Sequence, residues 1–400
     1  MTAEVCLWIT PKIFDDLTDP LPAIEAFFEH HRDWGTALTI VLCASNGDHV
    51  LNYAGPSHRD DVFDWARYNC FAAVPGETAG ATTRRHNADW LNRVREGGER
   101  SANPYSAGPM FTLSEQPMDY RVLAGIYAAI RTVAARRGVD VRLLEYLEPG
   151  PEFCHSIWKT SRHPEVASAA ADAGGHIIPG VIDVTLPLAA DPHQYAAYPT
   201  GIPAGLLAGD FVAAQTAAFV EDFGLDGILL GNQFGLVGFW DPAQAPPLTP
   251  SRAQGIERFF VAMRKQLGDR ALYWMDTYWR AEVERTVWGM TDTCYGTLDA
   301  IIVSTFAVLV ERTEIVPNLR SKAALNGPRV LLGLDFVDPW YWYRTHLDDR
   351  RTYAYQREVL AAESALIDGV TFFANDTFGH FVPPGPLRET LDVLSLENTQ

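Results

Sequence analysis

Short apolar runs recur along the chain, and polar or turn-forming residues bound each of them. Each run is apolar nearly throughout, which is typical of parallel strands covered on both faces. The pattern predicts eight strands, near residues 5–10, 36–43, 141–147, 227–232, 271–276, 299–304, 329–335 and 369–375.

Helical patterns lie between these strands. The segment 119–137 shows the signals most clearly, since it begins at Asp119 and ends before Gly138. Further helices are predicted over 20–34, 210–223, 251–267, 313–325 and 351–367. The alternation of strand and helix predicts an α/β fold of the (β/α)8 TIM-barrel type rather than an open doubly wound sheet. The sequence contains no GxGxxG or GxxxxGK[ST] motif, which weakens a nucleotide-binding alternative.

Two connections are too long for ordinary barrel loops. They cover about 46–118, after strand 2, and 149–209, after strand 3. Both leave the carboxyl ends of strands, where barrel enzymes build their active sites, so we expect them to form walls of a substrate site. The alternative is surface decoration or a dimer contact, which leaves a homo-oligomer open. We expect one catalytic domain over residues 1–400, with both insertions in it.

Composition narrows the class of protein. A chain of 400 residues that is 47% hydrophobic can bury a large core. The formal net charge of −18 argues against nucleic-acid partners and against docking on an anionic membrane. No run of 18 apolar residues predicts a membrane span, and no signal peptide is visible at the first residues. The five cysteines lack a CxxC spacing, so we expect a cytoplasmic location.

Carboxylates stand where several predicted strands end. Asp276 ends strand 5 and Asp335 ends strand 7, and Glu148 follows strand 3. We expect Asp276 and Asp335 to be the catalytic pair, with Glu148 as a third candidate that could replace either. Converging carboxylates at a barrel mouth suit a general acid with a base or nucleophile, or a metal held by oxygen ligands. The sequence has no HxH, HxxxH or HExxH motif, so we expect no metal and no cofactor.

Other polar and aromatic residues near the strand ends suit a carbohydrate. Carboxamides and acids bind sugar hydroxyls, and tryptophan rings stack on the C–H faces of sugars. The expected substrate-binding residues are Asn232, Gln233, Trp240, Trp279, Trp340, Asn375, Asp376 and Glu145. For Glu145 the pattern leaves two orientations open, toward the barrel interior or toward the helix layer. The alternative for the tryptophans is packing beneath the long insertions.

The pattern of strand-end carboxylates resembles that of TIM-barrel glycoside hydrolases. The local comparison is with the large clan of retaining hydrolases that have an Asn-Glu pair at strand 4 and a carboxylate at strand 7. Here Asn232 matches, but Gln233 stands where the acid/base Glu would be, and Asp335 stands where that clan usually has Glu. Because a glutamine cannot transfer the proton, either the catalytic pair lies elsewhere or Gln233 replaces a native Glu.

The predicted function is therefore hydrolysis of glycosidic bonds in an oligosaccharide, polysaccharide or glycoside. Two alternatives stay open at this point. One is a non-catalytic carbohydrate-binding barrel, which Gln233 favours. The other is a magnesium-dependent barrel lyase or aldolase that uses Glu145, Asp276 and Asp335 around the ion.

Overall fold

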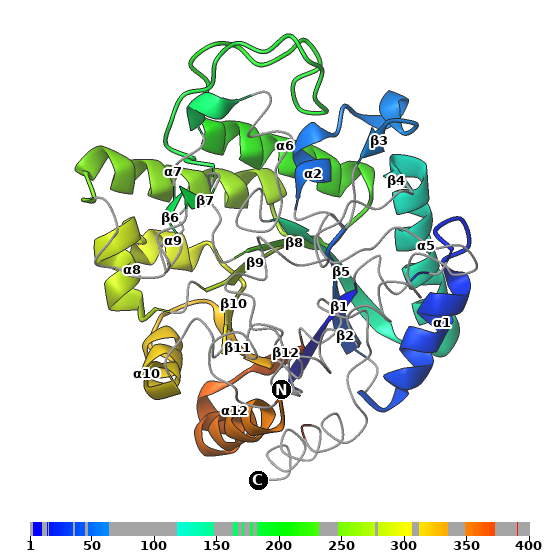
Figure 1. Cartoon of the computed structure of the whole chain (residues 1–400), viewed down its shortest axis with the longest axis vertical. Coiled ribbons are helices and arrows are strands. Elements are labelled where there is room, and N and C mark those ends of the chain that lie inside the picture. The colour runs from blue at the N-terminus through cyan, green and yellow to red at the C-terminus, as the bar shows by residue number, and fades with distance from the viewer. Residues whose placement is uncertain are drawn as a thin grey trace.

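The computed structural model shows a closed parallel barrel surrounded by helices (Figure 1). It describes residues 3–9, 14, 16–34, 37–44, 47–63, 118–147, 163–166, 170–171, 177–178, 182–231, 247–276, 279–305, 312–334, 349–372 and 390. The strands follow one another around the barrel in the order β1, β2, β5, β8, β9, β10, β11 and β12, and β12 pairs with β1 to close it.

The barrel strands are short and buried. Their bounds are Glu4–Ile9 (β1), Ala37–Leu42 (β2), Asp140–Leu147 (β5), Gly227–Leu230 (β8), Ala271–Met275 (β9), Ala300–Val303 (β10), Arg329–Leu334 (β11) and Gly369–Phe372 (β12). Each predicted strand has its counterpart here, and all neighbouring pairs are parallel. The predicted (β/α)8 fold is therefore confirmed.

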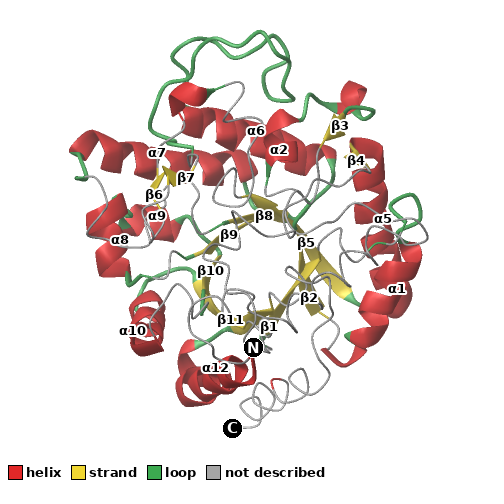
Figure 2. Cartoon of the chain, in the orientation of Figure 1, coloured by secondary structure: helices red, strands yellow, loops and turns green. Residues whose placement is uncertain are grey.

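Helices form a ring outside the barrel (Figure 2). They are Leu21–His30 (α1), Asp48–Asn52 (α2), Tyr120–Arg137 (α5), Ala208–Asp222 (α6), Pro250–Leu267 (α7), Ala281–Trp288 (α8), Asp292–Gly296 (α9), Arg312–Ala323 (α10) and Asp349–Glu363 (α12). The limits of α5 follow the sequence signals, because the Asp119 side chain accepts the Val122 N–H and Gly138 adopts a left-handed conformation at the other end. The helices α2, α8 and α9 had not been predicted from the hydrophobic pattern.

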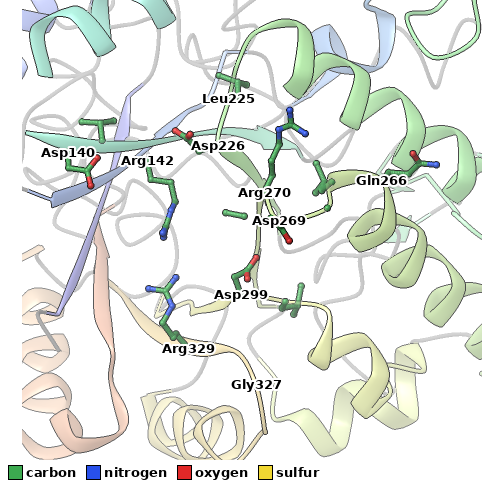
Figure 3. Close-up of a pocket in the computed structure, with 15 residues that line it drawn as sticks. Asp140, Arg142, Leu225, Asp226, Gln266, Asp269, Arg270, Asp299, Gly327 and Arg329 are labelled. Atoms are coloured by element: carbon green, nitrogen blue, oxygen red, sulfur yellow. The ribbon is translucent and has the colours of Figure 1, made fainter. Parts of the chain in front are cut away.

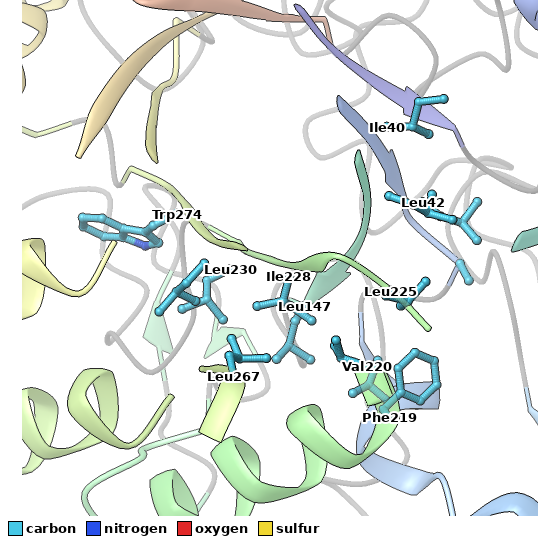
Figure 4. Packing of buried hydrophobic residues seen from close by; sticks show 14 of the residues in the cluster. Ile40, Leu42, Leu147, Phe219, Val220, Leu225, Ile228, Leu230, Leu267 and Trp274 are labelled. Carbon is cyan, nitrogen blue, oxygen red and sulfur yellow. The ribbon is translucent and has the colours of Figure 1, made fainter. Parts of the chain in front are cut away.

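Side chains alternate along each barrel strand between the barrel interior and the helix layer. Residues of the second kind fill the space between strands and helices, as Leu147, Ile228 and Trp274 do together with Phe219 and Leu267 (Figure 4). The interior is filled by a separate cluster, Cys6, Trp8, Val41, Cys43, Leu144, Tyr146, Leu229, Ala271, Tyr273, Met275, Ala300, Ile302 and Leu331. Because both faces of each strand are apolar, the barrel wall is buried from two sides.

Three strands begin with the same short motif, Leu-Asp-Gly, Leu-Asp-Ala or Ile-Asp-Gly. In each, the aspartate fastens its strand to the preceding one, since its carboxylate accepts a backbone N–H and its own N–H donates to the carbonyl of the same partner. The pairs are Asp226 with Leu143, Asp299 with Leu272 and Asp368 with Val330. After Asp226, a Cβ at Gly227 would lie 2.1 Å from the Ala271 carbonyl oxygen, so glycine allows the neighbouring strand to approach.

The described parts of the two insertions have local structure. The first holds α2, a 3-10 turn at Pro56–His58 (η3) and an antiparallel pair, Val62–Phe63 (β3) with Met118–Asp119 (β4). The second holds a 3-10 turn at Pro164–Val166 (η6) and the pair Ala170–Ala171 (β6) with Ile177–Ile178 (β7). Whether the whole chain is one catalytic domain stays a prediction. No helix in the described ranges is long and apolar enough to cross a membrane.

A buried histidine, His163, joins two segments of the second insertion through hydrogen bonds. The His163 ring lies between two carboxylates, with Nδ1 2.8 Å from Glu165 Oε1 and Nε2 3.1 Å from Asp191 Oδ2. The same Asp191 oxygen accepts the Tyr195 hydroxyl at 2.6 Å, and the Ala189 N–H donates to Glu165. These bonds hold residues 163–166 against residues 189–195.

Candidate active site

The alternation of side chains decides which strand-end residues face the barrel interior. In β9 the interior residues are Ala271, Tyr273 and Met275. Asp276 directly follows this strand and therefore belongs to the opposite face, with Leu272 and Trp274. The predicted catalytic carboxylate thus faces the helix layer rather than the mouth of the barrel.

The contacts of Asp276 agree with this orientation. The carboxylate is fully buried, and its Oδ1 accepts the backbone N–H of Ser304, at the end of β10, at 3.0 Å. Its Oδ2 accepts the side-chain amide of Asn318, on α10, at 2.6 Å. Asp276 therefore joins the ends of two strands to a helix outside the barrel, which favours a structural role over contact with a substrate.

A buried cation completes this group, which we call the α10 cluster: Asp276, Glu284, Tyr295, Asn318 and Lys322. The Lys322 ammonium is fully buried, pairs with Glu284 and lies 3.9 Å from Asp276 Oδ2. It also donates to the Trp279 carbonyl at 3.0 Å, and the Tyr295 hydroxyl donates to Glu284 at 2.6 Å. The α10 cluster therefore ties the segment after β9 to three helices.

Burial changes the acidity of this cluster. Desolvation raises the pKa of Asp276 to about 6, an effect that the Lys322 charge opposes and the Glu284 charge reinforces. Burial and the neighbouring Glu284 carboxylate also raise the pKa of Tyr295, so this phenol stays protonated and keeps donating its hydrogen bond. A raised carboxyl pKa is common in active sites, but here the group has no accessible surface.

Glu145 also faces the helix layer, which resolves the orientation that the sequence left open. It lies on β5 between the wall residues Leu143 and Leu147 and is fully buried. The Tyr127 hydroxyl of α5 donates to Oε2, and the Ala44 N–H donates to Oε1 at 3.3 Å. Burial, followed by the Glu145 charge, raises the pKa of Tyr127. This arrangement favours a structural role for Glu145 rather than contact with a sugar.

Trp279 packs on another tryptophan. Its ring stacks on Trp288 of α8 with centroids 4.5 Å apart and planes 20° from parallel. The residue is half-buried against the core, and its carbonyl is held by Lys322. One ring face is therefore covered, and the orientation of the ring is fixed from two directions.

The other expected site residues lie outside the described residues. They are the catalytic candidates Glu148 and Asp335 and the substrate-binding candidates Asn232, Gln233, Trp240, Trp340, Asn375 and Asp376. Their roles stay predictions. The structure brings none of the three described candidates into the barrel interior, since Asp276 and Glu145 face the helices and Trp279 packs on α8.

Sequence reasoning did not single out the partners of Asp276. Asn318 and Lys322 lie four residues apart on one face of α10, and Lys322 is one of only four lysines in the chain. An i, i+4 pair of polar residues next to the buried Ile315 and Leu319 of the same helix was the available signal. Within the ranges that the structure describes, no group of three or more His, Cys, Asp or Glu side chains is arranged to hold a metal ion.

Comparisons with known proteins give similarity at the level of the fold. No family model and no curated protein sequence matches the chain. A maltogenic α-amylase from Thermotoga neapolitana is 11% identical, with a TM-score of 0.45 over 99% of this chain and 77% of the amylase. A chitinase catalytic domain from Ostrinia furnacalis is 10% identical, with a TM-score of 0.44 over 99% and 97%. An α-galactosidase from Thermus thermophilus is 14% identical, with a TM-score of 0.36 over 81% and 61%. These matches, at such low identity and TM-score, carry no argument about the reaction.

Proposed function

We propose that the protein is a glycoside hydrolase whose active site lies at the carboxyl ends of the barrel strands, with Glu148 and Asp335 as its catalytic pair. The observation that carries the proposal is the alternation of side chains along β5 and β11. This alternation supports Glu148 and Asp335 as interior-facing candidates and disfavours Asp276.

The alternation is clear in the described part of each strand. On β5, Leu144 and Tyr146 belong to the interior cluster, and Glu148 is the next residue of this parity in the sequence. On β11, Leu331 belongs to the interior cluster while Leu332 and Leu334 belong to the wall, and Asp335 shares the parity of Leu331.

The two strands lie on opposite sides of the barrel, since three strands separate β5 from β11 in either direction. Carboxylates carried at their ends would flank a bond that lies across the mouth. Hydrolysis of a glycoside needs such a pair, one group to protonate the leaving oxygen and the other to act as nucleophile or to activate water. A separation of ~5–5.5 Å between them would give retention, and one of ~6.5–9.5 Å would give inversion.

The remaining candidates suit the binding of sugar rings. Asn232, Gln233, Asn375 and Asp376 would bind hydroxyl groups, and Trp240 and Trp340 would stack on rings. Trp279 stays a candidate for the same purpose, with Trp288 covering one face of its ring.

A panel of aryl glycosides and natural oligosaccharides, with and without a chelator, tests the proposal. We expect turnover of at least one glycoside that survives the chelator, since the mechanism uses carboxylates alone. The absence of turnover across the panel would contradict the proposal. Glycoside turnover abolished by the chelator would favour a metal-dependent reaction, although the outward orientations of Glu145 and Asp276 disfavour the metal site expected for it.

A non-catalytic carbohydrate-binding barrel is a second candidate. It is favoured by Gln233, which stands at strand 4 where the clan of retaining hydrolases has its acid/base Glu. Saturable binding of an oligosaccharide without any hydrolysis would support it. The two candidates therefore share the carbohydrate ligand and differ in turnover.

A further inference from the structure

A polar cavity lies at the end of the barrel opposite to the proposed active site (Figure 3). Its volume is about 1110 Å³, and it is open to solvent. The residues that line it stand at or just before the starts of β5, β8, β9, β10 and β11 and at the C-terminal end of α7. Its charged lining consists of four aspartates and three arginines: Asp140, Asp226, Asp269, Asp299, Arg142, Arg270 and Arg329. No role of this end of the barrel follows from the proposed hydrolysis.

Two arginines point toward each other in this cavity (Figure 3). Arg142 comes from β5 and Arg329 from β11, on the other side of the barrel. Both donate to one atom, the Tyr273 hydroxyl oxygen, at 2.6 Å from Arg142 Nη1 and 2.7 Å from Arg329 Nη2. Two positive charges are therefore held close together by a neutral group.

The Tyr273 hydroxyl and the Glu4 carboxylate, which contact the two arginines, have further hydrogen-bond partners within the protein. The Tyr273 hydroxyl donates its own proton to Glu4 Oε1 at 2.7 Å, and the Thr39 hydroxyl donates to the same oxygen. Burial and the Glu4 charge raise the pKa of Tyr273, so the phenol remains neutral. Glu4 pairs directly with Arg329 but lies 3.8 Å from Arg142. The single negative charge of Glu4 therefore compensates only part of the two positive charges of Arg142 and Arg329.

Arg142 retains binding capacity toward the cavity. Its side chain is 46% exposed, and only Nη1 has a hydrogen-bond partner among the described residues. The guanidinium fork therefore offers further N–H groups that a ligand can reach. Arg329 is 37% exposed and faces the same space.

Four aspartates line the cavity, and Asp140 and Asp269 partly offset the positive charge of the facing pair, whereas the other two are paired with arginines elsewhere. Asp226 accepts the Leu143 N–H and lies 3.1 Å from Arg131, and Asp299 accepts the Leu272 N–H and pairs with Arg264. Their charges are therefore balanced by arginines outside the facing pair.

We propose that this cavity binds a phosphate group, free or as a monoester, between Arg142 and Arg329. Guanidinium groups that approach from two sides suit a tetrahedral oxyanion, which presents acceptor oxygens in both directions, whereas a planar carboxylate pairs best with one fork. The cavity is larger than a bare phosphate requires, which leaves room for the organic part of an ester.

Titration of the full chain with inorganic phosphate tests the site directly. Isothermal calorimetry and thermal unfolding are followed in a buffer free of phosphate and sulfate, with sodium chloride keeping the ionic strength constant. A second titration uses glycerol phosphate. Arg142→Gln is compared with Arg258→Gln, which removes one exposed arginine on α7, away from the cavity, and matches the loss of charge.

We expect phosphate to bind saturably to the native chain and to Arg258→Gln. Arg142→Gln should bind phosphate at least roughly tenfold more weakly than the native chain, because a charge-assisted hydrogen bond is lost. Tighter binding of glycerol phosphate would identify an ester as the ligand, and tighter binding of inorganic phosphate would identify the free ion. An absence of saturable binding, or equal affinity in Arg142→Gln and Arg258→Gln, would overturn the proposal. Neither result depends on glycosidase activity, since the site lies at the other end of the barrel.

Discussion

Replacing the buried lysine of the α10 cluster should destabilise the protein strongly. Lys322→Met keeps the length and apolar stem of the side chain but removes the ammonium group. Glu284 and Asp276, both fully buried, then lose the charge that compensates them, and the Trp279 carbonyl loses its donor. The perturbation is therefore electrostatic rather than a change in packing volume.

The expected magnitude follows from this geometry. Removing one partner of a buried ion pair typically costs about 3–5 kcal/mol, because the remaining charge stays buried without compensation. For a chain of 400 residues, an unfolding entropy of about 2.1 cal/mol/K per residue converts this loss into a fall in Tm of about 4–6 °C. The loss should shrink at acidic pH, where protonation neutralises the uncompensated carboxylates.

Thermal and urea unfolding of matched variants provide the assay. Lys265→Met, at an exposed position on α7, makes the same chemical change without a buried partner and should alter stability by no more than about 0.5 kcal/mol. The double variant Lys322→Met/Glu284→Gln should recover part of the loss, because it leaves one buried charge fewer. Equal stabilities of Lys322→Met and Lys265→Met would refute the electrostatic reasoning, and so would a double variant less stable than Lys322→Met.

Three further outcomes are expected. Burial raises the pKa of Asp276 from 3.8 in the unfolded chain to about 6 in the native state, so the native state binds the carboxyl proton more tightly. The stability that this proton contributes is therefore full below about pH 4 and is lost as the pH rises to about 6. Asp276→Asn should therefore gain in stability relative to the native chain as pH rises through that window, as urea unfolding at several pH values would show; a constant difference would contradict this. Asp299→Ala should lose about 1–2 kcal/mol by leaving the Leu272 N–H unsatisfied, and Asp299→Asn, which keeps an acceptor, should lose less in the same unfolding assay. If Gln233 stands where a catalytic acid belongs, Gln233→Glu should raise glycoside turnover by ~10²–10⁴-fold, and an unchanged rate would leave the acid to Glu148 or Asp335.

The fold was predictable because burial on both faces leaves a strong signal. Runs such as Ala271–Met275 and Arg329–Leu334 are too short for helices and too apolar for loops, and the helices between them carry start and stop residues such as Asp119 and Gly138. Parallel order then follows from the alternation of strand and helix.

The orientation of the strand-end carboxylates was not predictable for the same reason. A strand that is apolar on both faces gives no pattern to separate interior from wall, so Asp276 and Glu145 looked equally able to face the mouth. The structure decides the face through the observed alternation of interior and wall residues, and the neighbours agree with it, Asn318 and Lys322 for Asp276 and Tyr127 for Glu145. Those neighbours are 18 to 46 residues away along the chain, and nothing local in the sequence indicates them.

The strand-start aspartates are a local sequence signal for the barrel strands. The repeated Leu-Asp-Gly, Leu-Asp-Ala and Ile-Asp-Gly motifs mark the beginnings of β8, β10 and β12. Their regular placement indicates a common way of joining each of these strands to its predecessor.

The turnover of Asp335→Asn on a glycoside that the native chain hydrolyses tests the central claim most directly. Asparagine keeps the size and hydrogen-bonding capacity of the side chain but lacks the charge that an oxocarbenium-like transition state requires. We predict that kcat falls by at least ~10²–10⁴-fold in Asp335→Asn and in Glu148→Gln with thermal stability nearly unchanged, whereas Asp276→Asn retains turnover at temperatures where it is folded. Near-native kcat in Asp335→Asn, or loss of turnover in folded Asp276→Asn alone, would contradict the assignment of the catalytic pair.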